Sequence, residues 1–434
     1  MDKILASGAK DYWFESSWAH HFMKIIADLH LHSKYSRATS RDSDLEHLSE
    51  AAIRKGVTLL GTGDFTHPEW FQELKSKLKP AENGFYTLGT NQKVRFVITG
   101  EISNIYNRKG KTRRVHNLII LPSLEAAEKI NNVLSWQGNL KADGRPILGM
   151  DSEELLKIVI NTEPQAMFIP AHIWTPWFAV FGSKSGFNSL EEAFGENTKY
   201  LAALETGLSS DPKMNWRISA LDKFTLVSNS DAHSPNNIGR EANVFDIDLN
   251  YSSLKEAIVK KDKTKFLYTI EFFPEEGMYH YDGHRLCQVR MSPEERKKVN
   301  GICPVCGKPL TIGVLSRVDE LADREDGYLP PDAIPFKSLV PLKEIIADVL
   351  KCQVKTKAVE EEYHKLINYF PNEFHILLEA SINDLTKVTL DNIAQGIMMV
   401  REGKVIKEPG YDGEYGQIRV LTSELPNPTQ KELF

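Results

Sequence analysis

Histidine and carboxylate residues follow short apolar runs in the first two-thirds of the sequence. The run that ends at Ala27 leads into Asp28-Leu29-His30-Leu31-His32, and the run that ends at Val227 leads into Ser228-Asn229-Ser230-Asp231-Ala232-His233. Alternate residues of an extended strand project from the same face, so His30 and His32 point the same way, as do Asp231 and His233. Imidazole and carboxylate groups together suit Zn²⁺, Mn²⁺ or Fe²⁺. The pattern therefore predicts a metal site.

Three further segments place a polar side chain after an apolar run, and these side chains are Asp64 with His67, Glu101, and His172. His116 instead precedes its run, and we expect it to reach the same place from a neighbouring loop. In a parallel α/β barrel, the carboxyl ends of the strands meet at the rim that holds the active site. A carboxylate shared by two ions there would support hydrolysis by a metal-activated water.

The elements that must position these residues are strands alternating with helices. Helical periodicity separates the apolar runs, for example at 45–53 and at 124–134. This alternation indicates a parallel α/β architecture. About seven such units in the first 270 or so residues favour a closed barrel over an open sheet.

Changes in composition divide the remaining chain. Aromatic residues, glycines and cysteines follow residue 270, and a region with helical periodicity follows Pro330-Pro331. We therefore predict a barrel over 23–270, a small zinc-binding module over 271–330 and a helical region over 331–425. Residues 1–22 form an extension to which no role is assigned, and 426–434 form a flexible tail.

Composition excludes several classes of protein. Of the 434 residues, 41% are hydrophobic and 26% are charged, which is typical of a globular chain and not of a disordered one. No apolar run approaches the roughly 18 residues of a membrane helix, and the first residues lack the apolar stretch of a secretory signal. The net charge of −6 excludes a wholly basic coat protein but not a locally basic groove.

The cysteines predict a second metal site. His284-x₂-Cys287 and Cys303-x₂-Cys306 have the spacing of a structural zinc site, in which three thiolates and one imidazole leave no open position. His280 is a rival to His284 as the fourth ligand. Only four cysteines occur in the chain, which is no disulfide framework, and thiols kept for a metal favour a reducing, cytoplasmic location.

Residues 24–270 resemble the polymerase-and-histidinol-phosphatase (PHP) family of metal-dependent phosphoesterases, chiefly through His30-Leu31-His32 and Asp231-Ala232-His233. The resemblance implies a distorted seven-stranded β/α barrel, (β/α)7, with a trinuclear cluster. It assigns His30, His32, Glu101 and Asp231 to the first ion. Glu101 would bridge to a second ion held by His116 and His172, and His233 would join the third.

The third ion is where this sequence departs from the family pattern. Phe65 stands where a histidine usually follows the residue matching Asp64, and Ser36-Arg37-Ala38 stands near the usual place of another histidine. Either Asp64 and His67 substitute as ligands, or the third site is weaker. Arg37 would alternatively provide a fixed positive charge that clamps a phosphate. Two or three divalent ions are therefore expected, with Mg²⁺ as well as Zn²⁺, Mn²⁺ and Fe²⁺ as candidates.

Three further segments, 171–187, 279–313 and 409–413, extend the resemblance to the endonuclease Q family, which nicks DNA on the 5′ side of deaminated bases. The resemblance implies a DNA repair endonuclease acting 5′ to uracil, hypoxanthine, xanthine or an abasic site. The products would carry a 3′-hydroxyl and a 5′-phosphate. The expected catalytic residues are Asp231, Glu101, Asp64 and His67.

Basic and aromatic segments indicate where damaged DNA would bind. Five cationic residues lie between 107 and 114 around Gly110, a predicted hairpin tip. The candidate DNA contacts are Arg37, Lys109, Lys111, Arg113, Arg114 and Lys184. Aromatic rings beside a metal ligand would stack an extruded base, or would simply pack in the core. The candidate lesion pocket comprises Trp174, Trp177, Phe178 and Ser183.

The last residues resemble the Gln-x-x-Leu-Phe peptide with which bacterial enzymes dock on the replication sliding clamp, here Gln430, Leu433 and Phe434. Two alternatives to a repair endonuclease stay open. One is a phosphomonoesterase acting on a small molecule, against which the zinc module and helical region argue. The other is a non-catalytic factor that binds DNA or the clamp. No membrane association is expected.

Overall fold

The computed structural model describes residues 24–89 and 91–420. The predictions for the extension at 1–22 and for the tail with Gln430, Leu433 and Phe434 lie outside these residues. Within them, no helix has both the length and the apolar character that crossing a membrane would require.

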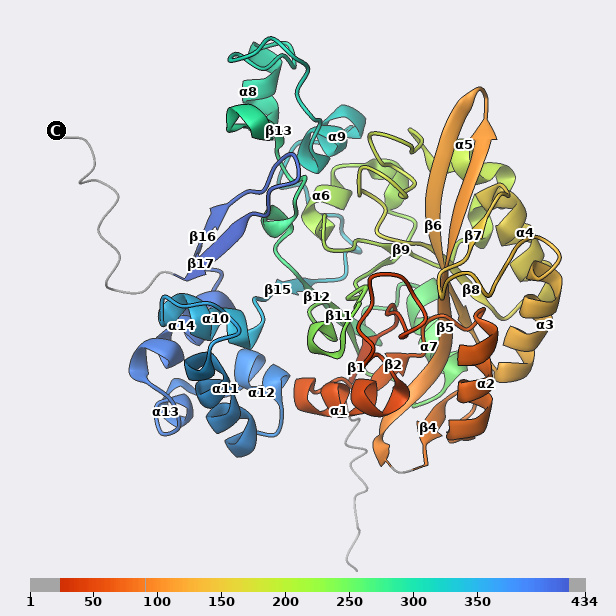
Figure 1. Cartoon of the computed structure of the whole chain (residues 1–434), viewed down its shortest axis with the longest axis horizontal. Coiled ribbons are helices and arrows are strands. Elements are labelled where there is room, and N and C mark those ends of the chain that lie inside the picture. Colours follow the sequence, from red (N-terminus) through yellow and green to blue (C-terminus); the bar gives the residue numbers. More distant parts are fainter. Residues whose placement is uncertain (1–23, 90, 421–434) are drawn as a thin grey trace, which may run out of the picture.

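A mixed sheet forms the centre of the larger part of the molecule (Figure 1). In the described residues it has eleven strands, and its main path runs β15-β12-β11-β1-β2-β5-β4-β3, with β6 and β7 paired to β5 and β8 paired to β6. The strands are β1 (Ile25–Asp28), β2 (Leu59–Gly61), β3 (Leu78–Pro80), β4 (Tyr86–Leu88), β5 (Asn91–Arg108), β6 (Lys111–Leu121), β7 (Ile147–Leu148), β8 (Met167–Pro170), β11 (Ala242–Phe245), β12 (Phe266–Glu271) and β15 (Phe336–Ser338).

Strand direction follows from the length of each connection. β1, β2 and β5 are parallel neighbours, as predicted, because helices connect them. β5 and β6 are antiparallel, since only Lys109 and Gly110 separate them and both residues have positive φ (52° and 75°). Gly110 therefore lies at the predicted hairpin tip. The expectation of a parallel sheet is therefore wrong at this pair. A two-residue turn joins only antiparallel neighbours, whereas parallel neighbours need a crossover connection of a dozen or more residues.

Two short parallel strands, β9 (Leu204–Glu205) and β10 (Leu226–Val227), lie beside the main sheet. Ala202 N donates to Phe168 O at 3.0 Å on the β8 side, and Leu31 forms a parallel bridge with Ala232 on the β1 side. The ends of β1, β8, β9 and β10 therefore meet in one place. The mixed α/β fold with a central sheet is confirmed, and closure into a seven-stranded barrel stays a prediction.

Helices cover the outer faces of the sheet. In α1, Asp44 accepts from His47 N as the N-cap, Gly56 ends the helix at φ 92°, and Leu48 and Ala52 are buried. The helices of this part are α1 (Leu45–Lys55), α2 (Pro68–Lys77), α3 (Leu124–Leu134), α4 (Ser152–Thr162), α5 (Leu190–Phe194), α6 (Pro212–Trp216) and α7 (Tyr251–Val259).

The cysteine module, residues 279–321, projects from one side of the central sheet (Figure 1). It consists of β13 (Asp282–His284), β14 (Val289–Met291), α8 (Pro293–Lys298) and α9 (Val314–Leu321). A hairpin close to the C-terminus, β16 (Val405–Glu408) and β17 (Gln417–Val420), lies beside it. Its turn reaches the module, since Tyr281 N donates to Gly410 O at 2.9 Å.

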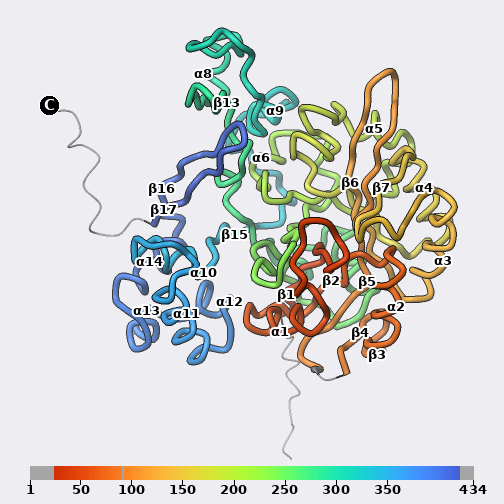
Figure 2. Tube along the Cα trace, viewed as in Figure 1, coloured from red at the N-terminus to blue at the C-terminus, as the bar shows by residue number. Residues whose placement is uncertain are grey.

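The helical region lies next to α1 (Figure 2). Within the region predicted to be helical, the first helix begins at Leu342 and the last at Asp391. Its helices are α10 (Leu342–Val349), α11 (Lys357–Tyr369), α12 (Glu373–Leu378), α13 (Ile382–Leu385) and α14 (Asp391–Arg401). β15 joins it to the central sheet by pairing with β12 in parallel.

Glu373 holds the helical region against α1. Its side chain is buried, and it accepts from Lys55 Nζ at 2.9 Å, from Leu342 N at 3.0 Å and from Tyr363 OH at 3.0 Å. A buried carboxylate that loses such partners is costly, because nothing else there offsets its desolvation. The contact therefore couples α1, α10, α11 and α12.

We predict that Glu373→Gln lowers the free energy of unfolding by about 3 kcal/mol. An amide carries no charge to offset that of the Lys55 ammonium, and it has only one oxygen in place of the two that accept in the wild type. Urea denaturation followed by circular dichroism measures the change. Glu379→Gln is the matched control, because that side chain is exposed beside His375 and its pair is worth at most about 0.5 kcal/mol. Equal losses in the two variants would contradict the assignment.

Candidate metal centre

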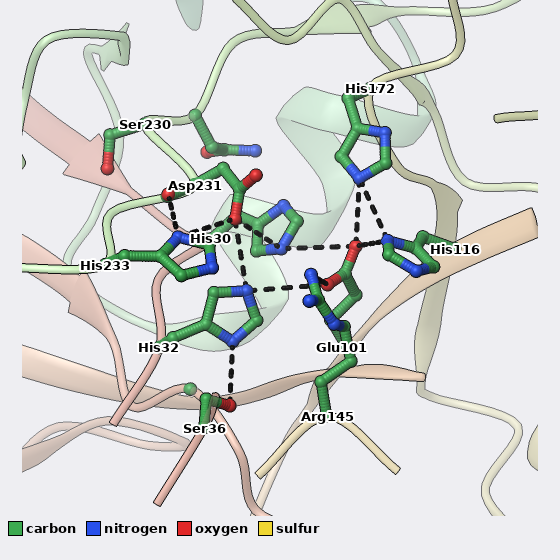
Figure 3. Close-up of polar contacts among 12 residues, drawn as sticks. His30, His32, Ser36, Glu101, His116, Arg145, His172, Ser230, Asp231 and His233 are labelled. Atoms are coloured by element: carbon green, nitrogen blue, oxygen red, sulfur yellow. Dashed lines mark hydrogen bonds and ion pairs between the residues drawn. The ribbon is translucent and has the colours of Figure 1, made fainter. Parts of the chain in front are cut away.

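Two groups of ligand atoms share one carboxylate at the ends of β1, β8 and β10 (Figure 3). Within each group the ligand atoms lie within 4.8 Å of one another. The first group is His30, His32, Glu101 and Asp231, and the second is Glu101, His116 and His172. The structure thus brings together the residues that sequence analysis assigned to the first two ions.

His30 and His32 follow β1 in extended backbone. Leu31 between them is buried in the core and forms the bridge with Ala232, while His32 N donates to Ala232 O at 2.9 Å. This pairing places the two motifs of the sequence side by side. Since the side chain of Leu31 faces the core, those of its two neighbours face the site.

His116 lies within β6 and does not precede its strand, which corrects the prediction that it reaches the site from a loop. The antiparallel register pairs Ser103 with His116 and Glu101 with Leu118. Because residues two apart share a face, His116 lies diagonally opposite Glu101 on the same side of the hairpin. His116 Nδ1 is 2.9 Å from Glu101 Oε1.

Glu101 is the centre of the arrangement. Its Oε1 atom is 3.1 Å from His172 Nε2, and its Oε2 atom is 3.4 Å from His32 Nε2 and 3.0 Å from Arg145 Nη1. Burial alone would raise the pKa of Glu101, but its close contact with His116 and the positive charge of Arg145 outweigh that effect and hold the pKa well below its usual value. The carboxylate is therefore ionised.

Outer carboxylates fix the orientation of the two β1 histidines. His30 Nδ1 is 3.0 Å from both oxygens of Glu205, and His32 Nδ1 is 3.0 Å from Asp64 Oδ1. The Nε2 atom of each ring therefore faces the centre, as metal-ligating histidines require. Among the described residues, His30 Nε2 is buried without a hydrogen-bond partner, so its lone pair is free to bind a cation.

Electrostatics also fit a divalent cation. Burial opposes charge on His30 and His32, yet Glu205 and Asp64 respectively raise the pKa of the two imidazoles well above the usual value. A site that stabilises protons this strongly also attracts metal ions. Burial lowers the pKa of His116 to about 4, so this ring is neutral near pH 7 and presents a lone pair.

The residues expected at a third ion do not gather into a ligand group within the described part of the chain. Asp64 is buried and turned outward, because its Oδ2 atom accepts from Ser33 N at 2.7 Å and from Ser36 Oγ at 2.9 Å. His67 stacks on Tyr35 at 4.5 Å between ring centroids. Through its Oδ1 atom Asp64 supports the ring of His32, and the expected roles of Asp64 and His67 at a third ion or in proton transfer stay predictions.

His233 lies on the open side of the centre. Its ring is 4.5 Å from that of His32, and its Nδ1 atom is 2.9 Å from Asp231 O. Its side chain is 29% exposed, whereas His30 and His32 are fully buried. Asp231 and His233 are adjacent, since His233 Nδ1 is 3.6 Å from Asp231 Oδ1. They do not share the face of a strand, because β10 ends at Val227 and Asp231 has a φ of 46°. The expected partners of His233 at a third ion lie elsewhere.

Sequence analysis missed Glu205 and Arg145. Glu205 directly follows the apolar run 201–204, so the rule that found the other ligands would have found it as well. Arg145 lies in the loop before β7, and no strand or motif marked it. Its approach to Glu101 depends on the path of that loop, which local sequence does not determine.

The predicted zinc ligands also meet. His284, Cys287, Cys303 and Cys306 form a group within 4.8 Å, with Cys306 Sγ 3.4 Å from His284 Nδ1. Gly307 has φ 70° and donates its N–H to Cys303 O at 2.9 Å, which closes the turn between the second pair of thiols. His280 is buried against Tyr281 and belongs to no such group, so His284 is the better placed fourth ligand.

Some of the candidate DNA contacts are exposed side chains, and the others contact neighbouring residues of the protein. Lys109, Lys111 and Lys184 are exposed around the hairpin and the loop beside it. Arg113 instead covers the Phe187 ring at 4.1 Å and donates to Gly186 O. Each of the two remaining candidates contacts another side chain: Arg114 lies 5.8 Å from the Phe178 ring, and Arg37 is paired to Asp143 at 3.2 Å.

The aromatic residues after His172 have different environments. Trp174 is fully buried and donates its indole N–H to Asn215 Oδ1 at 2.8 Å, so it belongs to the core and not to a lesion pocket. Phe178 lies 4.6 Å from the His116 ring, and Trp177 is partly exposed against Tyr279. Ser183 Oγ is buried without a hydrogen-bond partner. Phe178, Trp177 and Ser183 remain candidates.

Comparison with known sequences identifies relatives of this architecture. A family model described as the MJ0043 C-terminal domain matches residues 341–404, which cover most of the helical region. The uncharacterized protein MJ0043 of Methanocaldococcus jannaschii is 35% identical over 253 residues, 56% of this chain, and the match spans 31% of that longer relative. The uncharacterized protein YqxK of Bacillus subtilis is 28% identical over 418 residues, 91% of this chain and 99% of its own length.

Solved structures are similar over nearly the whole chain. The lesion-specific endonuclease PfuEndoQ from Pyrococcus furiosus matches with a TM-score of 0.82 and 32% identity, covering 92% of this chain and 96% of that one. An endonuclease Q complex with a 27-mer duplex substrate that carries an abasic lesion matches with a TM-score of 0.81 and 32% identity, covering 92% and 97%. The chain therefore belongs to the endonuclease Q family and is an enzyme.

Proposed function

We propose that this protein is a DNA repair endonuclease that hydrolyses the phosphodiester on the 5′ side of a deaminated base or an abasic site. The products carry a 3′-hydroxyl and a 5′-phosphate. One observation carries the proposal: a single buried carboxylate, Glu101, belongs to two adjacent ligand groups. A related enzyme of the family is a lesion-specific endonuclease, and another was solved with an abasic duplex substrate, which supports the choice of substrate.

The donor set of the two ligand groups fits two divalent ions. His30, His32 and Asp231 would hold one ion, His116 and His172 the other, and Glu101 would serve both. When bound, such ions supply an activated water and neutralise charge on the reacting phosphate. Zn²⁺, Mn²⁺ and Fe²⁺ suit these ligands, and Mg²⁺ suits the carboxylates.

The protein's own residues orient the site and define its opening. Glu205 and Asp64 hold the rings of His30 and His32, so these ligands lose little conformational freedom when they bind a cation. Asp231 and His233 are partly exposed beside ligands that are fully buried. The phosphodiester therefore approaches from the side of Asp231 and His233.

Exposed cations and rings lie where DNA would pass. Lys109, Lys111 and Lys184 would contact backbone phosphates without reading sequence. Phe178 lies beside His116 of the second ligand group, and Trp177 is partly exposed against Tyr279. One of the two rings would stack a base turned out of the duplex. Deaminated bases pair poorly and cost less to extrude, which accounts for lesion selectivity.

The remaining parts of the proposal concern structure and location. Strands β1, β2, β5, β6, β8, β9 and β10 would close as the seven-stranded PHP barrel, and the cysteine module would hold one structural zinc. Thiols gathered on a metal and not in disulfides favour a cytoplasmic enzyme. Docking of the C-terminal tail on the sliding clamp remains a sequence-based prediction.

We expect Asp231→Ala to abolish nicking of a duplex that contains uracil or hypoxanthine, because it removes a ligand at the open side of the site. Binding should survive, since Asp231 is an anion and contributes no attraction to DNA. End-labelled duplexes report nicking, and fluorescence anisotropy reports binding. Asp326→Ala changes an exposed carboxylate outside the site and should leave both unchanged. Full activity of Asp231→Ala, or turnover of a simple phosphomonoester without nicking, would contradict the proposal.

For the cysteine module, we predict that Cys303→Ser loses its bound zinc and unfolds at a lower temperature, because a tetrahedral structural site needs all four ligands. Elemental analysis and thermal unfolding measure the two effects. Cys352→Ser is the matched control, since the Cys352 thiol is hydrogen-bonded to Thr356, packs against the hydrophobic core and belongs to no ligand group of the described residues. Retention of the zinc by Cys303→Ser would remove that residue from the site.

A further inference from the structure

Arg145 lies beside the shared carboxylate of the metal centre and pairs with it (Figure 3). Its Nη1 atom is 3.0 Å from Glu101 Oε2. The side chains of Arg145, Asp231 and His233 are 25%, 23% and 29% exposed, whereas Glu101 is fully buried. The guanidinium therefore contacts the buried carboxylate on one side and the open face of the site on the other.

The backbone at Arg145 is fixed by contacts with neighbouring loops. Gly144 N donates to Tyr35 O at 3.0 Å, and Arg145 N donates to Asp143 Oδ1 at 3.1 Å. Gly144 also lies so close to Asp64 that a Cβ at this position would be 2.3 Å from Asp64 Oδ2. Because its backbone is held, any change of partner by Arg145 requires only rotation about its side-chain bonds.

A cation in the first ligand group and the Arg145 guanidinium compete for the same oxygen. Glu101 Oε2 is the carboxylate oxygen nearest to His32 Nε2, at 3.4 Å, and therefore faces that group. An ion bound there would neutralise Glu101 and repel the guanidinium. Because Arg145 is partly exposed, its side chain would then rotate toward solvent, on the side where Asp231 and His233 are also exposed.

We propose that Arg145 neutralises Glu101 while the metal centre is free of ions and contacts the non-bridging oxygens of the phosphodiester once divalent ions bind. The planar guanidinium matches two phosphate oxygens with parallel N–H donors, which a lysine ammonium cannot do. Phosphate affinity is thereby coupled to cation occupancy. The identity of the ligand as a phosphodiester rests on the proposed function, but the coupling itself is measured without DNA.

The first measurement is Mn²⁺ binding by isothermal titration calorimetry. Arg145→Gln should bind Mn²⁺ roughly fivefold or more tightly than the wild type, because a competing positive charge is gone. Arg145→Lys keeps the charge and should resemble the wild type. Arg324→Gln is the matched control, since Arg324 is similarly half-buried and paired with Asp222 but has no contact with the ligands. It should leave Mn²⁺ affinity unchanged.

The second measurement is the binding of inorganic phosphate to the full-length proteins, with and without saturating Mn²⁺. In the Mn²⁺ form, Arg145→Gln should bind phosphate roughly tenfold more weakly than the wild type, and Arg145→Lys should lie between them. Without Mn²⁺, the wild type and Arg145→Gln should bind phosphate equally poorly, because Arg145 is then engaged by Glu101. The Lys variant keeps the test valid if the Gln variant does not fold.

Two results would overturn the inference: Mn²⁺ affinity that does not rise in Arg145→Gln, or phosphate affinity of the Mn²⁺ form that is the same in the wild type and in both variants. The nicking assay is a separate test. If neither uracil nor hypoxanthine duplexes are cut while both binding results hold, the proposed substrate is wrong and the role of Arg145 stands.

Discussion

The buried charge of Glu101 is the constraint on which the rest of this site depends. An ionised carboxylate in a protein interior is costly unless cationic or hydrogen-bonding groups surround it. Here His116, His172 and Arg145 approach it at 2.9–3.1 Å, and each comes from a different segment of the chain. The β5–β6 hairpin, the end of β8 and the loop before β7 must therefore all be in place for the carboxylate to be stable.

A second pair of carboxylates, Glu205 and Asp64, contacts the outer Nδ1 atoms of His30 and His32. Glu205 and Asp64 accept from the rings that face Glu101, so the ligand atoms point inward before any ion arrives. The backbone of the site is also strained, since Asp64, His172 and Asp231 are non-glycine residues with φ of 48°, 30° and 46°. Such strain persists only where surrounding contacts fix it, and it is commonly found at functional sites. Orientation of the ligands is thus maintained by rigid packing.

The cysteine module and the helical region are attached to this centre by few but specific contacts. β15 extends the central sheet, Glu373 ties the helices to α1, and the turn after β16 pairs with Tyr281. The match to the MJ0043 C-terminal model covers the helices from 341 to 404. Relatives of known structure have the same arrangement over 92% of this chain, so these parts form one architecture and not a catalytic core with unrelated additions.

The sequence by itself identified most of the candidate metal ligands and the cysteine group. His30 with His32, and Cys303 with Cys306, follow from residue type and local spacing, because strand period and turn length are local properties. Only the tertiary structure decided the geometry in which these groups meet and which other residues support them. The antiparallel hairpin put His116 inside a strand, Ser33 and Ser36 held Asp64, the loop before β7 brought Arg145 to Glu101, and the core enclosed Trp174. These placements depend on the pairing and packing of segments far apart in the chain, and no local pattern encodes them.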